Sequence, residues 1–375
     1  MNSQTSILFD SFEFKNGIKT RNKLVMTPMT TWASNDDYTI SDDEIKHYEA
    51  RSGNLGLVIT GCTRVMANGI GFTNEYASYD DSFLPGLKKL AVAAKKGGAH
   101  AILQIYHAGN KAPVDLLTDG IPVSASAVPL APSAFYPGGT VSHELSHEEI
   151  LEIIKAFGET THRAIRAGFD GVELHGAHGF LLQNFFSPFY NQRTDQWGGS
   201  EEKRMKFALE VIKEVKDVIS RYATKPFLLG FRISPEEQEG YSVKDTFHFI
   251  DKLIDAGIDY LHISLGDLLH QKPVDAQNAE DTILKLMLAQ VDKRIPVIAA
   301  GKIKQADDAV EALKSGLSMV AIGHALIINP NWVELIEKGV KADEVLSLSK
   351  ANELAIPKKL QAFIKVAKGF FEVTE

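Results

Sequence analysis

The stretch Ala167-Gly168-Phe169-Asp170-Gly171-Val172-Glu173-Leu174 decides the fold class, because its pattern recurs along the chain. A small residue and a glycine precede a short apolar run, and similar arrangements return at 256–263, 315–322 and, more loosely, 97–105. Glycine just after a helix accepts the left-handed backbone that ends it. The apolar run that follows is typical of a buried parallel strand. Repeated units of helix, glycine and strand therefore predict alternating β and α elements.

Eight apolar runs are predicted to be strands, at residues 23–27, 55–60, 101–106, 171–175, 227–232, 260–264, 296–300 and 318–322. Between most of them lie helical patterns, the clearest at 147–166, which opens with a capping box at Ser146, and at 201–221. Eight βα units close most simply into a (β/α)8 TIM barrel. A doubly wound sheet is the alternative, but no Gly-x-Gly-x-x-Gly motif follows the first strand. We expect an α/β protein with one domain over residues 1–375 and the barrel at about 20–338.

Two segments lie outside the eight units. Residues 107–146, between the third strand and its helix, are rich in Pro, Gly, Ser and Thr and show no helical period. A loop of that length usually serves a site or covers one end of a fold. Residues 340–375 form a polar C-terminal extension, which we expect to be helical and to pack on the surface.

Composition sets limits on function and location. Forty Lys and Arg residues against 48 Asp and Glu give a net charge of −8, which argues against general nucleic-acid binding. Cys62 is the single cysteine, so an intrachain disulfide and every multi-thiolate metal site are excluded. The first residues are not those of a signal peptide, and no run approaches the ~18 apolar residues of a membrane span. We expect a cytoplasmic protein without membrane contact, and leave a homo-oligomer open.

Active sites of (β/α)8 barrels lie at the C-terminal ends of the strands. That rule selects a set of candidate residues without reference to any family. They are Thr27, Pro28, Met29, Thr30, Thr31 and Trp32 after the first strand, Thr60, Gly61 and Cys62 after the second, Gln104, Tyr106 and His107 at the third, Glu173, His175 and His178 at the fourth, Arg232 at the fifth, Gly301 and Lys302 at the seventh, and Gly323 and His324 at the eighth.

Gly301 and Gly323 occupy matching places after neighbouring strands, at the usual phosphate position of this fold. Glycine lets backbone N–H groups approach an anion, and a helix N-terminus favours its negative charge. Two tight βα turns are the alternative explanation of the same glycines.

His175 and His178 lie three residues apart just beyond a strand, and Glu173 precedes them. The three side chains suggest a metal site as one interpretation. The other is a pair of N–H donors aimed at a carbonyl oxygen that gains charge during reaction. Arg232 at a strand end would be a buried cation, which is costly unless an anionic ligand partners it.

Three blocks of sequence carry a family resemblance: Asn22-Lys23-Leu24-Val25-Met26-Thr27-Pro28-Met29-Thr30, Gln104-Ile105-Tyr106-His107-Ala108-Gly109, and a long block over residues 172–200 that contains Glu173-Leu174-His175-Gly176-Ala177-His178-Gly179-Phe180. They are similar to the Old Yellow Enzyme family of FMN-dependent ene-reductases. The resemblance runs from the first strand to about residue 335.

The resemblance implies roles at the matching positions. Bound FMN would be contacted by Pro28, Met29, Thr30, Cys62, Gln104, Arg232, Gly301, Lys302, Gly323 and His324. Gln104 would bond the pyrimidine edge of the flavin, and Arg232 would lie near the nitrogen that becomes anionic on reduction. Catalytic roles would fall to His175, His178 and Thr30, and substrate contacts to Trp32, His175, His178 and Phe180. No metal is expected.

The sequence departs from the family pattern at three places. Phe180 stands where many members have a tyrosine that donates a proton, so the donor would be water or another residue, with Tyr106 and Tyr190 the candidates. His324 replaces an arginine near the flavin phosphate, and Asn110 replaces another arginine. Lys302 would restore part of the lost positive charge.

The expected function is therefore an FMN-dependent oxidoreductase that takes hydride from NADH or NADPH and reduces a small electron-poor acceptor, such as an enone, a nitro compound or a quinone. Three alternatives stay open. They are a flavin-binding barrel without ene-reductase turnover, a metal-dependent barrel enzyme that uses His175, His178 and Glu173, and a Schiff-base aldolase. The aldolase lacks a lysine at the end of the sixth strand, where the sequence reads Ile263-Ser264-Leu265-Gly266.

Overall fold

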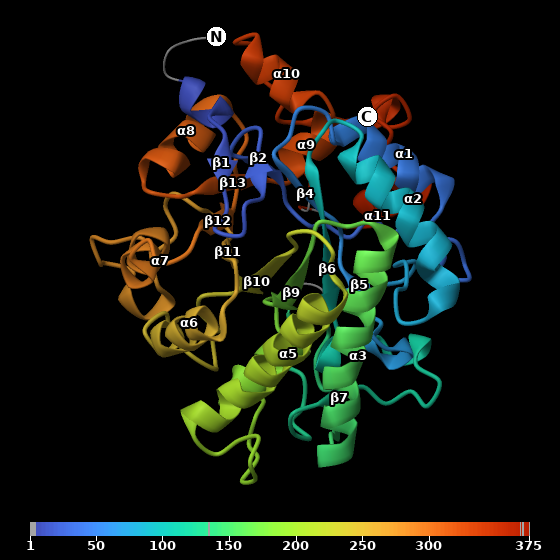
Figure 1. Cartoon of the computed structure of the whole chain (residues 1–375), viewed down its shortest axis with the longest axis vertical. Helices are drawn as coiled ribbons and strands as arrows, with labels where there is room; N and C mark the ends of the chain where they lie inside the picture. The colour runs from blue at the N-terminus through green and yellow to red at the C-terminus, as the bar shows by residue number, and fades with distance from the viewer. Residues whose placement is uncertain (1–4, 134–135, 368, 370, 375) are drawn as a thin grey trace.

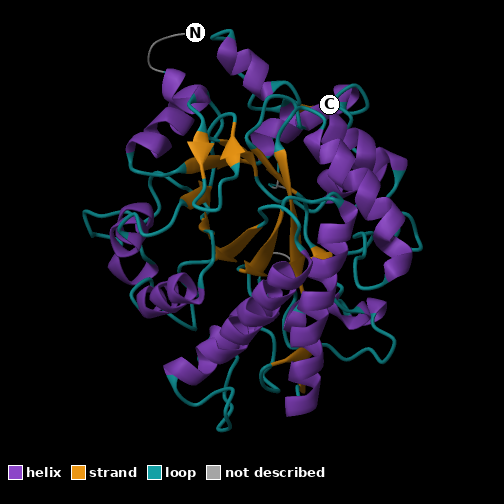
Figure 2. Ribbon diagram, viewed as in Figure 1, coloured by secondary structure: helices purple, strands orange, loops and turns teal. Residues whose placement is uncertain are grey.

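Parallel strands surrounded by helices form the centre of the molecule (Figures 1 and 2). The computed structural model describes residues 5–133, 136–367, 369 and 371–374. Nine strands form the main sheet, and one of them, β5 (Thr63–Arg64), pairs only with β6. The other eight close into a barrel because β4 pairs with both β3 and β6. They are β3 (Leu24–Met26), β4 (Leu57–Ile59), β6 (His100–Tyr106), β9 (Gly171–Gly176), β10 (Leu228–Ile233), β11 (Tyr260–Ser264), β12 (Val297–Ala300) and β13 (Met319–Ile322). The eight predicted strands and the barrel are confirmed.

Helices follow the strands and cover the outside of the barrel, with α3 and α5 packed side by side (Figures 1 and 2). They are α1 (Asp42–Arg51), α2 (Leu84–Lys95), α3 (His147–Ala167), α4 (Leu181–Phe186), α5 (Glu201–Tyr222), α6 (Asp245–Ala256), α7 (Ile283–Val291), α8 (Ala306–Lys314), α9 (His324–Ile328) and α10 (Trp332–Glu337). The main core lies between these helices and the outer faces of the strands, and includes Leu103, Val172 and Leu229.

The pattern from which the fold was predicted has a clear physical basis at α3. Ser146 accepts a hydrogen bond from the backbone N–H of Glu149, and the Glu149 carboxylate accepts one from the Ser146 N–H, which completes the capping box. Ile150 and Phe157 on its apolar face are fully buried. Gly168 ends the helix with φ 88°, a left-handed conformation that glycine adopts without strain. The chain then enters β9 at Gly171, as predicted.

The two ends of the barrel interior differ. Near the N-terminal ends of the strands, Leu57, Ile102, Leu228 and Tyr260 form an apolar cluster. A small antiparallel hairpin of β1 (Phe12–Glu13) and β2 (Lys19–Thr20) adds Phe14 to that cluster and covers this end. The C-terminal ends of the strands carry the polar residues. The functional site can therefore open only at the C-terminal end.

The segment 107–146 is a long excursion, as predicted, and its described part contains no α-helix. It holds the short elements η4 (Gly109–Lys111), η5 (Val114–Leu116), β7 (Val123–Ser124) and β8 (His143–Glu144). Pro113, Ala131 and Tyr136 from this segment line the cavity described below. The loop therefore helps to form the site.

The C-terminal extension differs from its prediction. It contains β14 (Leu346–Ser347), η7 (Leu348–Lys350), α11 (Lys358–Val366) and β15 (Val373–Thr374), so it is helical only in part. Leu360 and Phe371 are buried against Ile327 and Ile328, and both also line the cavity. The extension therefore also contributes to the cavity. Its polar average composition did not indicate this role, because the apolar residues that carry it are spaced along the segment.

Candidate active site

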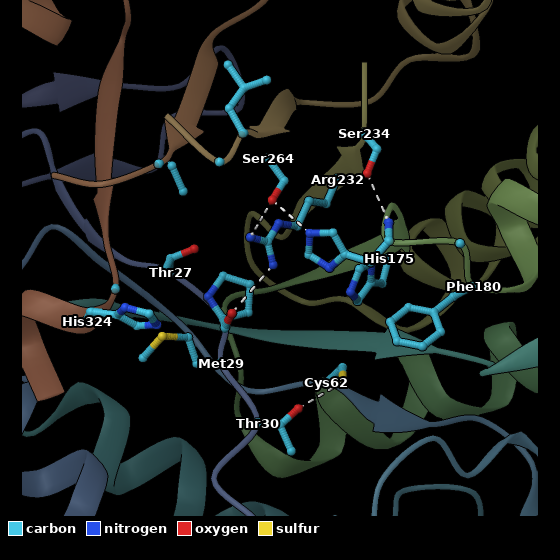
Figure 3. Close-up of a pocket in the computed structure, with 18 of the residues that line it drawn as sticks. Thr27, Met29, Thr30, Cys62, His175, Phe180, Arg232, Ser234, Ser264 and His324 are labelled. Atoms are coloured by element: carbon cyan, nitrogen blue, oxygen red, sulfur yellow. Dashed lines mark hydrogen bonds between the residues drawn. The ribbon is translucent and has the colours of Figure 1, made fainter. Parts of the chain in front are cut away.

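A cavity of about 1400 Å³ opens at the C-terminal ends of the barrel strands. In Figure 3, His324 and Met29 lie at one end, Phe180 lies at the other, and Arg232 lies between them. The residues to which the family resemblance gives a role all line this cavity: Pro28, Met29, Thr30, Trp32, Cys62, Gln104, His175, His178, Phe180, Arg232, Gly301, Lys302, Gly323 and His324. The strand-end rule selected these residues apart from Phe180, together with Thr27, but it also selected residues that do not line the cavity, namely Thr31, Thr60, Gly61, Tyr106, His107 and Glu173.

Arg232 is a buried cation at the centre of the cavity. One terminal nitrogen donates to the Pro28 carbonyl at 3.4 Å and the other to the Ser264 hydroxyl at 3.1 Å (Figure 3). Its Nε has no hydrogen-bond partner among the described residues. Burial lowers the pKa of Arg232, while the charge of Glu173 opposes that shift. The side chain is thus held in place by two of its five N–H bonds.

Ser264 was not selected as a site residue from the sequence. Its hydroxyl lies 2.8 Å from Nε2 of His178 as well as 3.1 Å from Arg232, so it joins two predicted site residues. Ser264 is the last residue of β11, so the strand-end rule could have selected it.

Glu173 lies inside the barrel. Its carboxylate accepts hydrogen bonds from Gln104 Nε2 at 2.7 Å, from the Tyr260 hydroxyl at 3.0 Å and from Nδ1 of His262 at 2.9 Å. Burial favours the protonated form, but His262 and these hydrogen bonds hold the pKa of Glu173 below its usual value, so it is a carboxylate. Because the Gln104 nitrogen is bonded to Glu173, the amide oxygen of Gln104 is left as an acceptor for a ligand.

The metal interpretation loses support from this arrangement. Glu173 is engaged by three side chains away from the histidine pair. In the part of the chain that the structure describes, no group of three or more His, Cys, Asp and Glu side chains is placed to hold a metal ion.

His175 and His178 form the edge of the site next to Phe180. Their ring centroids are 5.0 Å apart. Burial lowers the pKa of both rings well below the usual histidine value, and the positive charge of Arg232 lowers it further, so both are neutral near pH 7. Nδ1 of His175 accepts the backbone N–H of Ala177 at 3.3 Å, which leaves Nε2 as its donor. The pair can therefore supply neutral N–H groups to a ligand oxygen.

The end of the cavity near β12 and β13 is formed differently. A Cβ atom on Gly301 would lie 2.7 Å from the Leu265 carbonyl oxygen, and one on Gly323 would lie 2.9 Å from Thr27 Cγ2. Close packing therefore requires glycine at both positions whether or not a phosphate binds there. The phosphate role of Gly301 and Gly323 stays a prediction.

The positive charges at this end are already paired. The Lys302 ammonium is largely exposed and lies 3.5 Å from the Asp267 carboxylate. His324 packs against Phe371 with ring centroids 4.3 Å apart, and burial lowers its pKa, so it is neutral near pH 7. Lys304, which was not predicted, also lines the cavity and lies 3.3 Å from Glu344.

Thr30 and Cys62 lie together on one wall, with the hydroxyl oxygen 3.8 Å from the sulfur (Figure 3). Burial raises the pKa of the Cys62 thiol to about 12, so it is a neutral thiol. The Thr27 hydroxyl is buried in the cavity wall with no hydrogen-bond partner among the described residues. This wall offers neutral polar groups to a ligand.

One candidate proton donor is excluded. Tyr106 does not line the cavity, because it is fully buried behind Phe180, with ring centroids 4.9 Å apart, and its hydroxyl donates to the Glu75 carboxylate. Tyr190 lines the cavity, and its hydroxyl accepts the backbone N–H of Ala131 at 3.1 Å. Lys111 and Tyr136 also line the cavity and were not predicted.

The residues present fit an FMN ring. Arg232 and Thr27, each of which has an unpartnered polar atom among the described residues, line one cavity together with Gln104. A flavin pyrimidine ring carries both acceptors and a donor, so it matches this set. The cavity also exceeds the usual ~300–1,000 Å³ of a small-molecule site, which leaves room for a second ligand above the flavin.

Comparisons with known proteins agree with this site. Residues 7–343 match the NADH:flavin oxidoreductase / NADH oxidase family. The chain is 43% identical over 374 residues to the "Probable NADH-dependent flavin oxidoreductase YqiG" of Bacillus subtilis, covering 99% of both chains. It is 38% identical over 357 residues to the NADH:acrylate oxidoreductase of Vibrio harveyi, covering 94% of this chain but only 35% of that protein.

A solved structure shares the fold. Morphinone reductase in complex with tetrahydroNAD superposes with a TM-score of 0.75 at 25% sequence identity, covering 90% of this chain and 92% of the other. Across the described residues, none of the helices combines the length and apolar character that crossing a membrane would need.

The family match, the identity to relatives and the cavity chemistry agree on FMN as the bound cofactor and NAD(P)H as the reductant. The chain belongs to the NADH:flavin oxidoreductase / NADH oxidase family, which is the Old Yellow Enzyme family that its sequence resembled.

Proposed function

We propose that this protein reduces small electron-poor acceptors, namely activated C=C bonds such as enones, nitro compounds or quinones. The observation that carries the proposal is the pair of neutral N–H donors at His175 and His178, next to Phe180 in the cavity that also holds Arg232 and Gln104. A relative named for acrylate, a molecule with an activated C=C bond, supports the acceptor class.

The cofactor side of the cavity would be formed by Gln104, Arg232, Cys62 and the segment Pro28, Met29 and Thr30. Bound FMN supplies a ring that can accept hydride from a nicotinamide and give it to an acceptor. Arg232 would stabilise the negative charge that the reduced ring carries, because it is buried and its Nε–H has no other partner. Gly301, Lys302, Gly323 and His324 would lie along the phosphate end.

The histidine pair would hold the oxygen of the acceptor. Nε2–H of His175 is free to donate, and His178 is held by Ser264 Oγ and by the bond from its backbone N–H to Ser234. Because both rings are neutral, they would polarise a carbonyl or nitro group without protonating it outright. Trp32 and Phe180 would form apolar walls around the rest of the acceptor.

The barrel, the 107–146 loop and the C-terminal extension all contribute residues to this cavity, so we infer one domain over the whole chain. The same cavity would hold a nicotinamide and an acceptor in turn. A small molecule is therefore the expected partner.

The test is an acceptor panel. The protein is reduced anaerobically with NADH or NADPH and then mixed with an enone, a nitro compound or a quinone, while the return of the oxidised absorbance is followed. We expect at least one acceptor class to reoxidise the protein, and His175→Asn to slow that step. Reduction by nicotinamide followed by no reoxidation with any of the three would leave a flavin-binding barrel without this activity and contradict the proposal.

A further inference from the structure

Lys111 lies at the acceptor end of the cavity, on η4. Its ammonium nitrogen donates to the backbone carbonyl of His178 at 2.5 Å. The same nitrogen is 6.0 Å from the ring centroid of Phe180 and 5.1 Å from that of Tyr136. The cation therefore lies beside the second histidine and next to the ring of the residue that replaces the family's tyrosine.

The surrounding backbone leaves space for this lysine. Gly179 adopts a positive φ of 75°, and a Cβ atom there would lie 2.7 Å from the Lys111 nitrogen. Any larger residue at Gly179 would displace the ammonium from its bond to the His178 carbonyl. The bond to the His178 carbonyl and the space left by Gly179 together fix the position of the Lys111 ammonium.

Lys111 keeps N–H groups for a ligand. It forms no ion pair with a carboxylate among the described residues, and an ammonium carries three N–H bonds of which the His178 carbonyl accepts one. The negative charge that acts on Lys111 is that of Glu237, whose carboxylate is bonded instead by Gln183 at 3.0 Å and by Ser187. Burial lowers the pKa of Lys111, with Glu237 acting against the shift, so its ammonium is a stronger acid than a lysine in water.

We propose that Lys111 donates the proton to the α-carbon of an enone acceptor, in place of the tyrosine hydroxyl that Phe180 cannot supply. The inference rests on the proposed function. When hydride has been added to the β-carbon, the electron pair of the C=C bond lies on the α-carbon and the carbonyl oxygen. An N–H bond of Lys111 then breaks, its electrons stay on the nitrogen, and a C–H bond forms at the α-carbon. Water afterwards returns a proton to the amine.

Two tyrosines are the competing donors in the same cavity. The Tyr190 hydroxyl accepts the Ala131 N–H, and its ring packs with Val128 and Leu130 of the 107–146 loop. Burial raises the pKa of Tyr136 to about 12, which makes it a weaker acid than an ordinary tyrosine. Within the described part of the chain, Lys111, unlike these tyrosines, forms a hydrogen bond to the histidine pair, through the His178 carbonyl.

The experiment compares Lys111→Met, Lys111→Arg, the double variant Lys111→Met/Phe180→Tyr and Tyr190→Phe with the wild type. Each is isolated with its flavin and reduced with NADH, and reoxidation is timed with 2-methylcyclohexenone and with a nitro compound. We expect the ratio of the enone rate to the nitro rate to fall about 10²-fold in both single lysine variants, since general-acid catalysis contributes ~10²–10⁴-fold. Phe180→Tyr in the Lys111→Met background should restore the ratio at least in part.

A second readout separates proton donation from a structural effect. Wild-type protein should form 2-methylcyclohexanone with one configuration at the α-carbon, and Lys111→Met should lose that selectivity because water protonates either face. Lys155→Met removes a largely exposed lysine on α3 and serves as the matched control.

Three results would overturn the proposal. An unchanged ratio in Lys111→Met, an unchanged ratio in Lys111→Arg, which keeps the charge but is a far weaker acid, or an equal fall in Tyr190→Phe would each do so. Reoxidation of the wild type by the nitro compound but not by the enone would reject Lys111 as a donor while leaving the reductase function in place. Reoxidation by neither would reject both.

Discussion

The two ends of the cavity are built on different principles. At the end formed by β9, β10 and β11, polar side chains hold one another in place: Ser264 bonds both His178 and the buried Arg232. At the end formed by β12 and β13, glycines are required by packing, and Lys302 is paired with a carboxylate near the surface. The first end is organised before any ligand arrives, whereas the second is a tightly packed turn with compensated charges. We infer that the first end determines the chemistry.

The largest expected effect tests the histidine pair. His178→Ala removes one of two donors to the acceptor oxygen, and loss of one such donor typically costs ~10²–10³-fold in rate. The rate of reoxidation of reduced protein by an enone should fall by about that factor. His324→Ala, at the opposite end, is the matched control, and its rate of reoxidation should fall far less. Equal effects of the two substitutions would contradict the difference between the ends.

The second effect concerns the binding of the cofactor. Arg232→Met removes a buried cation that we expect to contact FMN, and truncating one partner of such a pair costs about 2 kcal/mol or more. The FMN dissociation constant of the flavin-free protein should therefore rise about 30-fold or more. Lys302→Met removes an exposed, paired charge worth ~0–1 kcal/mol. It should change the FMN dissociation constant less than about fivefold. Fluorescence titration of FMN measures both, and a larger effect of Lys302→Met would reverse the assignment.

A third effect appears in the pH dependence of stability. Burial lowers the pKa of His178 well below the usual histidine value, and it lowers the pKa of His324 as well. Above pH ~6.5 these two rings are neutral in both the folded and the unfolded chain. Their titration then takes nothing from the free energy of unfolding. As the pH falls below ~6.5, the unfolded chain binds protons that the folded chain refuses, so stability is lost toward the folded-state pKa.

Substitution by glutamine removes that proton linkage. The free energy of unfolding, measured by urea titration between about pH 7 and pH 5.5, should fall less steeply in His178→Gln than in the wild type. The difference should be a fraction of the ~1.4 kcal/mol per pH unit of a fully desolvated ring, because His178 is open to the cavity and solvent screens its charge. The change in slope should be smaller for His324→Gln. A steeper loss of unfolding free energy in His178→Gln would mean that the His178 ring of the wild type is charged in the folded protein.

The smallest effect concerns the C-terminal extension. Phe363 on α11 stacks on Trp32 with ring centroids 3.8 Å apart, and Trp32 lines the cavity. Aromatic pairs contribute ~0.5–1.5 kcal/mol beyond the area they bury, so Phe363→Ala should raise the KM for the acceptor about fivefold. Phe363→Tyr keeps the stack and is the control. An unchanged KM in Phe363→Ala would return the extension to a purely structural role.

Local patterns predicted most of the fold. The glycine-then-apolar repeat located four of the eight barrel strands, and apolar runs located the other four. The Ser146 capping box located the start of α3. These signals depend on residues that are close together in the sequence. The contribution of the C-terminal extension to the cavity was not predicted, because its contact with Trp32 and Ile328 joins residues that are far apart in the sequence. A polar average composition gave no sign of that contact.

The candidate site could be predicted in position more fully than in detail. The strand-end rule selected residues that line one cavity, but it could not show where each side chain points. Tyr106 is directed to Glu75, and Glu173 is directed into the barrel, although both lie on strands that reach the site. Lys111 was missed because it belongs to an irregular turn after β6, where no period relates sequence position to direction.

The central claim is that this barrel holds a flavin that nicotinamides reduce. The most direct measurement is the visible spectrum of the purified protein, recorded anaerobically before and after addition of NADH and, separately, NADPH. The account predicts a yellow protein whose absorbance bleaches with at least one of the two nucleotides. A colourless protein that does not take up added FMN, or a yellow protein that neither nucleotide bleaches, would contradict it.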